Sequence, residues 1–282
     1  MIIFKTIPAL QSHLRLLNSQ KKTTGFVPTM GALHAGHLSL IHQAQMACNV
    51  TVASIFVNPT QFNDAADFEK YPVTIEKDCL QLEQQQTDIL FLPGVTEMYP
   101  AGILQHQHFN LGNLETVWEG RYRPGHFQGV CQVVKRLLEI VQPHQLFMGQ
   151  KDYQQCKVIE RLIELTHSKT RLNIIPTLRE TNGLAMSSRN VRLNTEQRQL
   201  AAAIYQQLTW LKKNLATQSF ENLIQQATAA LLAAGFSKVD YVAIANSDTL
   251  QPASGIPDNQ QLVGLIAAFM GEVRLIDNLV LN

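Results

Sequence analysis

The sequence predicts an α/β fold: a Rossmann-like domain whose parallel sheet carries helices on both faces, followed by a smaller C-terminal α+β domain. From residue 1 to about 175, short apolar runs alternate with amphipathic stretches of helical period, which is the β-α-β rhythm of such a sheet. Beyond residue 177, stretches rich in Ala, Gln and Leu precede apolar runs that Gly, Pro and Asn separate, a pattern that favours antiparallel pairing. At 282 residues the chain exceeds the usual single-domain size, so we expect domains over residues 1–177 and 178–282.

The elements of the first domain follow from the length and spacing of the apolar runs. Short runs without a helical period predict strands over 24–27, 50–57, 89–92 and 146–148. Apolar residues at i, i+3 and i+4 predict helices over 10–17, 38–47, 73–85, 129–141 and 152–166. Three segments that carry motifs follow predicted strands, and ligands bind at the carboxyl ends of parallel strands. We therefore expect these segments to converge on one crevice.

The same rules place two helices and then two or three strands in the second domain. The expected helices cover 195–215 and 220–234. The expected strands cover 239–245, 262–270 and 273–276, with turns of Gly, Pro and Asn between the last runs. These elements suggest a small α+β domain with antiparallel pairing.

Composition and charge exclude several classes of protein. A net charge of +1 argues against a nucleic-acid partner, and 45% hydrophobic residues with regular periodicity exclude disorder. Residues 1–5 contain no apolar core of signal-peptide length, and the longest apolar run, 262–270, is too short to span a bilayer. We expect a cytoplasmic protein without a membrane partner. Its four cysteines form no C-x-x-C pair, so we expect reduced thiols.

The tetrapeptide His34-Ala35-Gly36-His37 lies where a predicted strand turns into a predicted helix. The first turn of a helix has unpaired N–H groups and a partial positive charge, which favour an anion there. The two histidines are candidates for phosphate donors, zinc ligands or ordinary structural residues, although no third zinc ligand stands at a suitable spacing. Gly31 and Gly36 have P-loop spacing, but His37-Leu38 replaces the Lys-Ser/Thr pair, so this is not a Walker site.

A second candidate segment, residues 149–155, also follows a strand and opens a helix. Lys151 would stand at the positive end of the helix dipole, which is unfavourable for a cation, so an anionic ligand explains it better than a solvated lysine. Asp152 is a candidate helix N-cap or magnesium-associated carboxylate. Gln155 lies one helical turn beyond Lys151, where its amide can both donate to and accept from a hydroxy acid.

Two further segments carry polar side chains at predicted turns. Residues 179–190 place Ser187, Ser188 and Arg189 in a glycine-containing loop, which suits a pyrophosphate but is also common in turns that lead into helices. Asn58 and Gln61 follow the predicted strand 50–57, and their amides serve either substrate recognition or turn capping. Gly183 in the first of these loops makes a lid-like closure a hypothesis.

Five collinear motifs give the chain a resemblance to a known family. They are P-T-M-G-A-L-H-x-G-H from Pro28, F-V-N-P-T-Q-F from Phe56, R-P-G-H-F-x-G-V from Arg123, G-x-K-D-x-Q-Q from Gly149 and G-L-A-M-S-S-R-N from Gly183. Together they resemble the pantoate-β-alanine ligase family of the HIGH/KMSKS nucleotidyltransferase superfamily. Residues 34–37 would be the HIGH-type element and residues 186–189 the KMSKS-type element. The resemblance covers the first domain and the hinge, whereas the second domain matches only in texture.

The resemblance implies a reaction in two steps. The carboxylate of (R)-pantoate attacks the α-phosphorus of ATP to give pantoyl adenylate and pyrophosphate, and the amine of β-alanine then displaces AMP to give pantothenate. It further implies a catalytic first domain that binds ATP and pantoate and a second domain that acts as a lid. Magnesium would bridge the phosphates mainly through water rather than through dedicated protein ligands. The family also implies a homodimer.

The resemblance also implies a role for each motif residue. The implied catalytic residues are His34, His37 and Lys151. His37 would be the proton donor, and Lys151 would neutralise the transferring phosphoryl group. Gln61, Gln155 and Met30 would bind pantoate, and Gln61 would also bind β-alanine. The residues implied to bind ATP are Met30, Gly31, Ala32, Leu33, His34, Ala35, Gly36, His37, Gly149, Gln150, Lys151, Asp152, Leu178, Met186, Ser187, Ser188 and Arg189.

Three positions depart from the pattern of the family, and two rival functions remain. Gln150, Asn182 and Gln132 stand where Glu, Asp and Thr are frequent in the family. Amides thus replace two possible carboxylates, and the sequence does not determine which groups surround the magnesium ion. Another adenylate-forming enzyme of the superfamily is the nearest rival, and the paired Gln61 and Gln155 argue against it. A catalytically silent nucleotide-binding module is the other rival, but the implied catalytic residues are all present. A tRNA-dependent enzyme is disfavoured because the second domain lacks a basic surface.

Overall fold

The computed structural model describes residues 1–61, 69, 71–102, 107–256 and 258–282, so Phe62 of the second motif lies outside the described residues. The chain forms two compact units. Unit 1 consists of Met1–Leu111, Arg123–Gly149 and Gln155–Ile175, and unit 2 of Gly112–Tyr122, Gln150–Gln154 and Pro176–Asn282. The change of unit after Ile175 lies close to the expected boundary, but two short segments of the first half group with unit 2. The division into domains 1–177 and 178–282 therefore stays a proposal.

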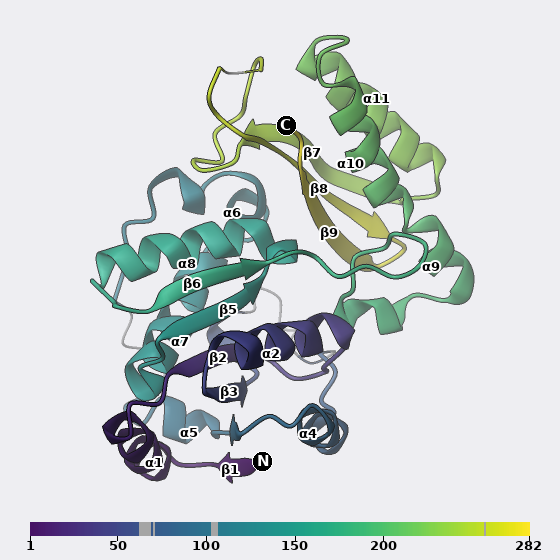
Figure 1. Ribbon diagram of the computed structural model, residues 1–282. Helices are drawn as coiled ribbons and strands as arrows, with labels where there is room; N and C mark the ends of the chain where they lie inside the picture. The colour runs from purple at the N-terminus through teal and green to yellow at the C-terminus, as the bar shows by residue number, and fades with distance from the viewer. Residues whose placement is uncertain (62–68, 70, 103–106, 257) are drawn as a thin grey trace. The chain divides into compact units, whose positions relative to one another are not determined.

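Unit 1 is built on a parallel sheet of six strands in the order β1-β4-β3-β2-β5-β6 (Figure 1). Its strands are β1 (Ile2–Phe4), β2 (Thr24–Thr29), β3 (Val50–Ile55), β4 (Ile89–Phe91), β5 (Gln145–Gly149) and β6 (Arg171–Ile175). Its helices are α1 (Ile7–Ser19), α2 (Ala35–Ala47), α4 (Ile75–Gln84), α5 (Val95–Met98), α7 (His126–Val141) and most of α8 (Tyr153–Leu165), with the 3₁₀ helix η1 (Pro59–Gln61). The parallel sheet that the sequence predicts is confirmed.

Burial of the central strands shows that helices cover both faces of this sheet. Every residue of β3 is buried, although successive side chains point to opposite faces. Helix α2 packs across β2, β3 and β5, while α7 packs on β2 and on α1. Gly25 of β2 permits this close packing, because a Cβ there would lie 3.2 Å from the Cβ of Ala44 on α2. The resulting core is apolar.

The strand order reverses at β2. From β2 the chain proceeds through β3 and β4 in one direction, whereas β5 and β6 lie on the other side of β2. In open parallel sheets, ligands bind beside the carboxyl ends of the strands at such a reversal. The residues that follow β2, β3 and β5 include Met30, Asn58 and the segment after Gly149, so three predicted motifs begin at neighbouring strand ends, as expected.

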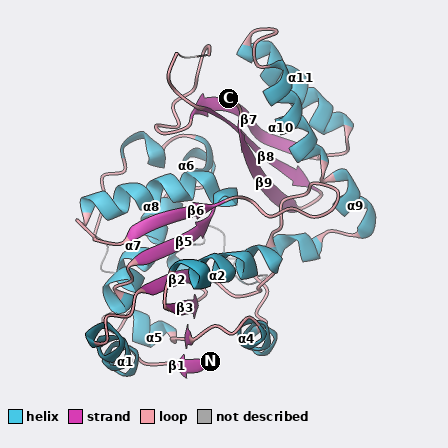
Figure 2. Cartoon of the chain, viewed as in Figure 1, coloured by secondary structure: helices cyan, strands magenta, loops and turns pink. Residues whose placement is uncertain are grey.

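Unit 2 contains an antiparallel sheet of three strands in the order β7-β8-β9 (Figure 2). The strands are β7 (Lys238–Asn246), β8 (Leu262–Met270) and β9 (Val273–Val280). Helix α10 packs on β8 and β9, and α11 packs on β7. The remaining elements of unit 2 are α6 (Trp118–Tyr122), α9 (Thr195–Leu200), α10 (Ala203–Asn214), α11 (Phe220–Ala233), η2 (Gly112–Glu115), η3 (Gln150–Asp152) and η4 (Ser188–Arg192). The predicted α+β texture of this half is confirmed.

The two short inserted segments are tied to the C-terminal sheet by polar contacts. The guanidinium of Arg274 on β9 donates to both carboxylate oxygens of Glu119 on α6, at 2.6 and 2.9 Å. The amide of Gln154 donates to the carbonyls of Leu114 and Val117, at 2.8 and 2.9 Å. These bonds explain why residues 112–122 and 150–154 belong to unit 2 rather than to the parallel sheet from which they emerge.

Several element boundaries differ from the sequence prediction. The expected helix 195–215 is two helices, because around Ala201 and Ala202 the backbone changes to i to i−3 hydrogen bonds. Strand β9 continues to Val280, beyond the predicted end at 276, and includes the buried polar pair Asp277 and Asn278. All four cysteines are free thiols, two of them buried and two half-buried. Within the described ranges, no helix has the length and apolar character needed to cross a membrane.

Candidate active site

The turn between β2 and α2 is held by a buried carboxylate from α4. Asp78 is 0% exposed, and its two oxygens accept hydrogen bonds from the backbone N–H groups of Ala32 (2.9 Å) and Leu33 (2.8 Å). Gly31 and Ala32 adopt left-handed φ angles of +80° and +49°, which Gly31 tolerates because it lacks a Cβ. A Cβ at Gly31 would lie 3.0 Å from an Asp78 oxygen. Residues 30–33 therefore have one defined shape.

The two motif histidines form the N-terminal cap of α2. His34 is the N-cap residue, and its Nδ1 accepts a hydrogen bond from the N–H of Gly36 at 3.1 Å. The Nδ1 of His37 accepts from the N–H of His34 at 3.4 Å, which completes a capping box. The two rings lie 4.1 Å apart, centroid to centroid. Because Nδ1 accepts in both rings, the proton of each neutral imidazole is assigned to Nε2.

This cap changes the expected source of anion contacts at the helix terminus. The sequence suggested that open backbone N–H groups of the first turn would meet a phosphate. The N–H of Gly36 instead donates to the His34 imidazole, so this backbone N–H is not open to an anion. Among the described residues, no three His, Cys, Asp or Glu side chains gather as a cluster that could hold a metal ion.

Gln61 is positioned by the first turns of α7. It ends η1, and its carbonyl lies 2.8 Å from Nδ1 of the buried His126. Nε2 of His126 lies 3.1 Å from a guanidinium nitrogen of Arg123, a donor, so Nε2 accepts and Nδ1–H donates to the Gln61 carbonyl. A Cβ at Gly129 would lie 2.1 Å from the carbonyl oxygen of Thr60, so only glycine permits this contact. The R-P-G-H-F-x-G-V motif thus fixes the Gln61 backbone.

Asn58 acts within the same turn, consistent with the capping interpretation. It is 0% exposed, and its amide donates to the carbonyl of Gly129 at 3.3 Å and to the hydroxyl of Thr60 at 3.0 Å. Its amide oxygen accepts from the hydroxyl of Tyr99 at 2.9 Å. Burial raises the pKa of Tyr99 above its usual value, which keeps that donor protonated. Asn58 therefore secures the end of β3 beside Gln61.

The side chains predicted to bind pantoate lie on either side of the residues that follow β2. Gln61 follows β3 and Gln155 lies in the first turn of α8, which follows β5; β2 runs between those strands. Both side chains are half-buried, and within the described part of the chain neither amide has a hydrogen-bond partner. Met30 also lines a mainly apolar cavity of about 170 Å³ formed with the residues after β3 and the start of α4.

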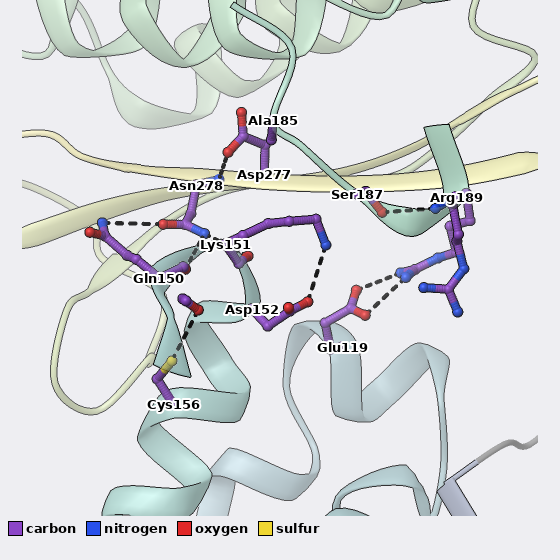
Figure 3. Close-up of polar contacts among 12 residues, drawn as sticks. Glu119, Gln150, Lys151, Asp152, Cys156, Ala185, Ser187, Arg189, Asp277 and Asn278 are labelled. Atoms are coloured by element: carbon purple, nitrogen blue, oxygen red, sulfur yellow. Dashed lines mark hydrogen bonds and ion pairs between the residues drawn. The ribbon is translucent and has the colours of Figure 1, made fainter. Parts of the chain in front are cut away.

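Unit 2 carries the predicted lysine segment. Nζ of Lys151 in η3 lies 3.2 Å from a carboxylate oxygen of Asp152, and the Lys151 side chain is only 17% exposed (Figure 3). The ion pair holds the ammonium group beside Asp152, the last residue of η3. The backbone of the same turn is held by Asn278 of β9, whose amide donates to the carbonyls of Gln150 and Lys151, each at 2.9 Å. The lysine therefore stands on an ordered turn rather than on a solvated loop.

A tight hairpin forms the second predicted segment of unit 2. Arg179 and Ala185 form an antiparallel bridge, and the N–H of Met186 donates to the carbonyl of Leu178 at 3.0 Å. Gly183 at the tip has a φ of +95°, and a Cβ there would lie 2.8 Å from the ring of Tyr205. The hairpin brings together Leu178 and Met186, two residues that the resemblance assigns to ATP.

The residues after the hairpin begin a 3₁₀ helix. The hydroxyl of Ser187 caps η4 by accepting from the N–H of Arg189 at 3.2 Å. The buried Asn190 ties this turn to the hairpin, because its amide donates to the carbonyl of Ala185 at 3.0 Å and to the carboxylate of Glu180 at 2.9 Å. Hydrogen bonding to Arg198, together with that from Asn190, holds the pKa of Glu180 below its usual value. Ser187 thus has a local role in addition to any contact with pyrophosphate.

Hydrogen bonds account for the amide at two of the three departures from the family pattern. The amide of Gln150 donates to the side-chain oxygen of Asn278 at 3.4 Å. The amide of Asn182 donates to the carbonyl of Arg198 at 3.0 Å and accepts from the N–H of Leu184 at 3.1 Å. An ionised carboxylate has no proton to donate in either place. Nothing in the structure explains Gln132, which is half-buried on α7.

The structure thus brings the predicted residues together in two groups. Unit 1 holds Met30 to His37, Gln61, Gly149 and Gln155, whereas unit 2 holds Gln150 to Asp152, Leu178 and Met186 to Arg189. Sequence reasoning missed the residues that position these groups, namely Asp78, His126 and Asn278. His126 belongs to the R-P-G-H-F-x-G-V motif, but the motif alone assigned it no role. Asp78 and Asn278 are single polar residues in a helix and a strand, and no sequence pattern marked them.

Comparisons with known proteins show similarity to one family along nearly the whole chain. A model of the family described as pantoate-beta-alanine ligase matches residues 2–280. The pantothenate synthetase of Azobacteroides pseudotrichonymphae genomovar. CFP2 is 42% identical over 280 residues, which cover 99% of this chain and 99% of that protein. The pantothenate synthetase of Bacteroides fragilis (strain YCH46) is 42% identical over 279 residues, 99% of this chain and 98% of that protein.

Solved structures show the same similarity. A crystal structure of pantothenate synthetase from Thermus thermophilus aligns with a TM-score of 0.91 at 40% identity, covering 99% of each chain. A crystal structure of pantoate-beta-alanine ligase from Francisella tularensis, complexed with beta-gamma ATP and beta-alanine, aligns with a TM-score of 0.81 at 35% identity. That alignment covers 99% of this chain and 97% of the other.

Proposed function

The chain belongs to the pantoate-beta-alanine ligase family, and we propose that the two groups of site residues divide the work of its reaction between them. The enzyme condenses pantoate with β-alanine at the expense of ATP and forms pantothenate. We propose that the reaction passes through pantoyl adenylate. A carboxylate oxygen of pantoate forms a bond to the α-phosphorus while the bond to the β-phosphate oxygen breaks, and pyrophosphate leaves with that electron pair.

In this proposal the capped histidines contact the phosphates of ATP. Their rings lie side by side, tilted to one another, at the N-terminus of α2, and each Nδ1 accepts a backbone hydrogen bond, which leaves the ring proton on Nε2. A hydrogen-bond donor held in place before the reaction stabilises charge that develops in the transition state without a cost of reorganisation. His37 lies within the helix and His34 at its cap, so their donors keep a fixed spacing. This cap is the observation that carries the proposal.

Lys151 supplies the cation in the proposed mechanism. Charge builds on the phosphoryl oxygens as pyrophosphate departs, and a preorganised ammonium group reduces the free energy of that transition state. The 3.2 Å contact with Asp152 orients the ammonium group, and its low exposure limits competition from water. Gly149, Gln150 and Asp152 are proposed to contact the same nucleotide as part of the turn.

Pantoate is proposed to bind between the amides of Gln61 and Gln155 and beside Met30. Both amides can donate to a carboxylate and accept from a hydroxyl group, and neither has a hydrogen-bond partner within the described residues. In the second step, the uncharged amine of β-alanine attacks the carbonyl carbon of pantoyl adenylate near Gln61. The carbon–oxygen bond to AMP breaks, AMP leaves, and the amine loses a proton to give the amide.

The hairpin of unit 2 is proposed to bind the adenine and pyrophosphate parts of ATP. Leu178 and Met186 are joined by a backbone hydrogen bond, while Ser188 and the guanidinium fork of Arg189 are suited to phosphate oxygens. Ordering of this segment by ATP should slow hydrogen exchange at residues 178–190. Equal exchange with and without ATP would contradict a lid-like closure of this segment.

Magnesium, a homodimer and a cytoplasmic location also belong to the proposal. Within the described ranges no cluster of three ligands fits a dedicated metal cage, and Asp78 is occupied by two backbone N–H groups. We therefore propose that magnesium arrives with the phosphates of ATP, and we assign no step to it. Equilibrium dialysis with magnesium alone should then show no bound ion. Sedimentation of the purified protein tests the dimer.

Exchange of labelled pyrophosphate into ATP in site variants tests the proposed roles. His37→Ala and Lys151→Ala should each lower pantoate-dependent exchange by about 100- to 1,000-fold, the usual loss for one preorganised donor. His42→Ala and Lys169→Ala change exposed residues outside the site and should exchange at the normal rate. Near-normal exchange by both site variants would contradict the proposed roles.

A further inference from the structure

Asn278 on β9 is buried and bonded to the turn that carries Lys151. Its side-chain N–H groups reach the carbonyls of Gln150 and Lys151, each at 2.9 Å, and its side-chain oxygen lies 3.4 Å from the amide nitrogen of Gln150. Only 2% of Asn278 is exposed. Figure 3 shows the side chain directed at that turn. One asparagine therefore holds two successive peptide carbonyls of the turn, one on each side of the Lys151 Cα.

The neighbouring residue holds the other predicted ATP segment of unit 2. The carboxylate of Asp277 is bound by both terminal nitrogens of Arg179, at 2.5 and 3.0 Å. Arg179 lies on the hairpin that leads into Met186 to Arg189, and its guanidinium also stacks 3.7 Å above the ring of Tyr205. The N–H of Asn278 donates to the Asp277 carboxylate at 2.8 Å. Two successive residues of β9 thus bind the two segments: Asn278 binds the lysine turn, and Asp277 binds the hairpin through Arg179.

The position of this pair is unusual for a strand interior. Asp277 and Asn278 pair with Ile266 and Leu265 of β8, and both are buried where apolar residues would pack without hydrogen-bond requirements. A buried polar group costs free energy unless its hydrogen bonds are satisfied. Here the bonds of Asn278 go to the lysine turn rather than only to neighbouring strands, so the sheet alone does not account for the asparagine.

We infer that Asn278 is a positioning residue for adenylation: it sets the place of Lys151 relative to the hairpin that carries Leu178 and Met186 to Arg189. This inference rests on the proposed role of Lys151. If the amide is lost, the carbonyls of the turn lose their donor and the ammonium group is no longer held at one place. Displacement of a charge-stabilising group by about 1 Å is enough to reduce a rate by about 100-fold.

A double-mutant cycle distinguishes positioning from a purely structural role. Asn278→Ala removes the donors, and Asn278→Asp keeps the size but turns a carboxylate oxygen toward the carbonyls. Whichever variant retains a cooperative unfolding transition should exchange pyrophosphate about 10- to 100-fold more slowly at saturating substrates, with little change in KM for pantoate. Leu279→Ala, which trims the next residue where it packs on the core of unit 2, should lower Tm and leave the exchange rate unchanged.

The same Asn278 substitution, made in the Lys151→Ala variant, should lower the rate of pyrophosphate exchange little further, because its effect on the rate passes through the lysine. An equal proportional loss in both backgrounds would overturn the inference, as would normal exchange by the folded Asn278 variant. Normal exchange by Lys151→Ala alone would instead contradict the proposed function, so the two failures are distinguishable.

Discussion

The carboxylate of Asp78 and the backbone N–H of Leu33 lie 2.8 Å apart, although 45 residues separate them in the sequence. With the companion bond to Ala32 at 2.9 Å, this contact fixes the turn that presents the capped histidines of α2. Helix α4, which holds none of the predicted site residues, therefore fixes the shape of the turn. The shape of the turn has to be set before the substrate arrives, because a preorganised site needs no reorganisation at the moment of reaction.

Asp78→Asn tests this coupling. One carboxylate oxygen becomes an NH₂ group, which faces a backbone N–H that then has no acceptor. An unsatisfied buried group of this kind costs about 1–3 kcal/mol in the free energy of unfolding, and we expect KM for ATP to rise. Urea unfolding and exchange kinetics measure both effects. Asp88→Asn is the matched control, because Asp88 accepts from one backbone N–H, that of Thr51, at the opposite end of the sheet. Unchanged use of ATP by a folded Asp78→Asn enzyme would contradict the coupling.

Gly129→Ala tests the support of Gln61. The added Cβ would lie 2.1 Å from the carbonyl oxygen of Thr60, so η1 and α7 have to move apart. Overpacking of this kind costs about 1–3 kcal/mol, and displacement of Gln61 should raise KM for pantoate more than KM for ATP. Initial rates at varied pantoate and ATP check the split. Gly255→Ala, where a Cβ meets nothing within 4 Å, should behave as the unmodified enzyme; a normal KM for pantoate in Gly129→Ala would exclude this role.

Glu180 gives a prediction for the pH dependence of stability. The pKa of this carboxyl lies below its usual 4.5, mainly because of its hydrogen bonds to Arg198. The ionised form is therefore favoured in the folded state, and the stability it contributes is present above pH 4.5 and lost as the pH falls toward the lower, folded value. Glu180→Gln should be less stable than the unmodified protein near neutral pH, and the difference should shrink in acid. Urea midpoints from about pH 7 to about pH 3 measure it; a difference independent of pH would contradict the assignment.

The buried pair of Arg179 and Asp277 should be costly to break. Asp277→Asn leaves the guanidinium of Arg179 without its anion, and loss of one partner of a buried ion pair costs about 3–5 kcal/mol. Arg161 and Glu164 on α8 form a matched exposed pair at 2.9 Å, where Glu164→Gln should cost no more than about 1 kcal/mol. Equal losses of unfolding free energy in the two variants would show that the buried pair contributes little.

Local patterns in the sequence predicted most of the fold. The helical spacing from Leu38 and the apolar run of β3 located their elements closely, because each signal arises from neighbours in the sequence. Strand β1 was missed because it has only three residues and exposes Ile2 and Ile3 at the sheet edge. Helix α2 begins at Ala35, earlier than predicted, because an imidazole provides the cap and histidine is not among the usual N-cap residues.

The site could be predicted only in part, because sequence signals arise from residues that are close together in the chain. Lys151 and Arg189 stand in local motifs, and the structure places both on ordered turns. The residues that position the site act across long separations, with 65 residues between His126 and Gln61 and 127 between Asn278 and Lys151. No periodicity or composition in a short window carries information about such contacts. They became visible only when burial and hydrogen-bond partners were known.

Pyrophosphate exchange by the unmodified enzyme tests the adenylation mechanism most directly. With labelled pyrophosphate, ATP and pantoate, label should enter ATP in the absence of β-alanine, because the first step is complete and reversible without the amine. Omission of pantoate should stop exchange, and addition of β-alanine should release AMP together with pantothenate. Exchange that proceeds without pantoate, or that requires β-alanine, would contradict a pantoyl-adenylate intermediate.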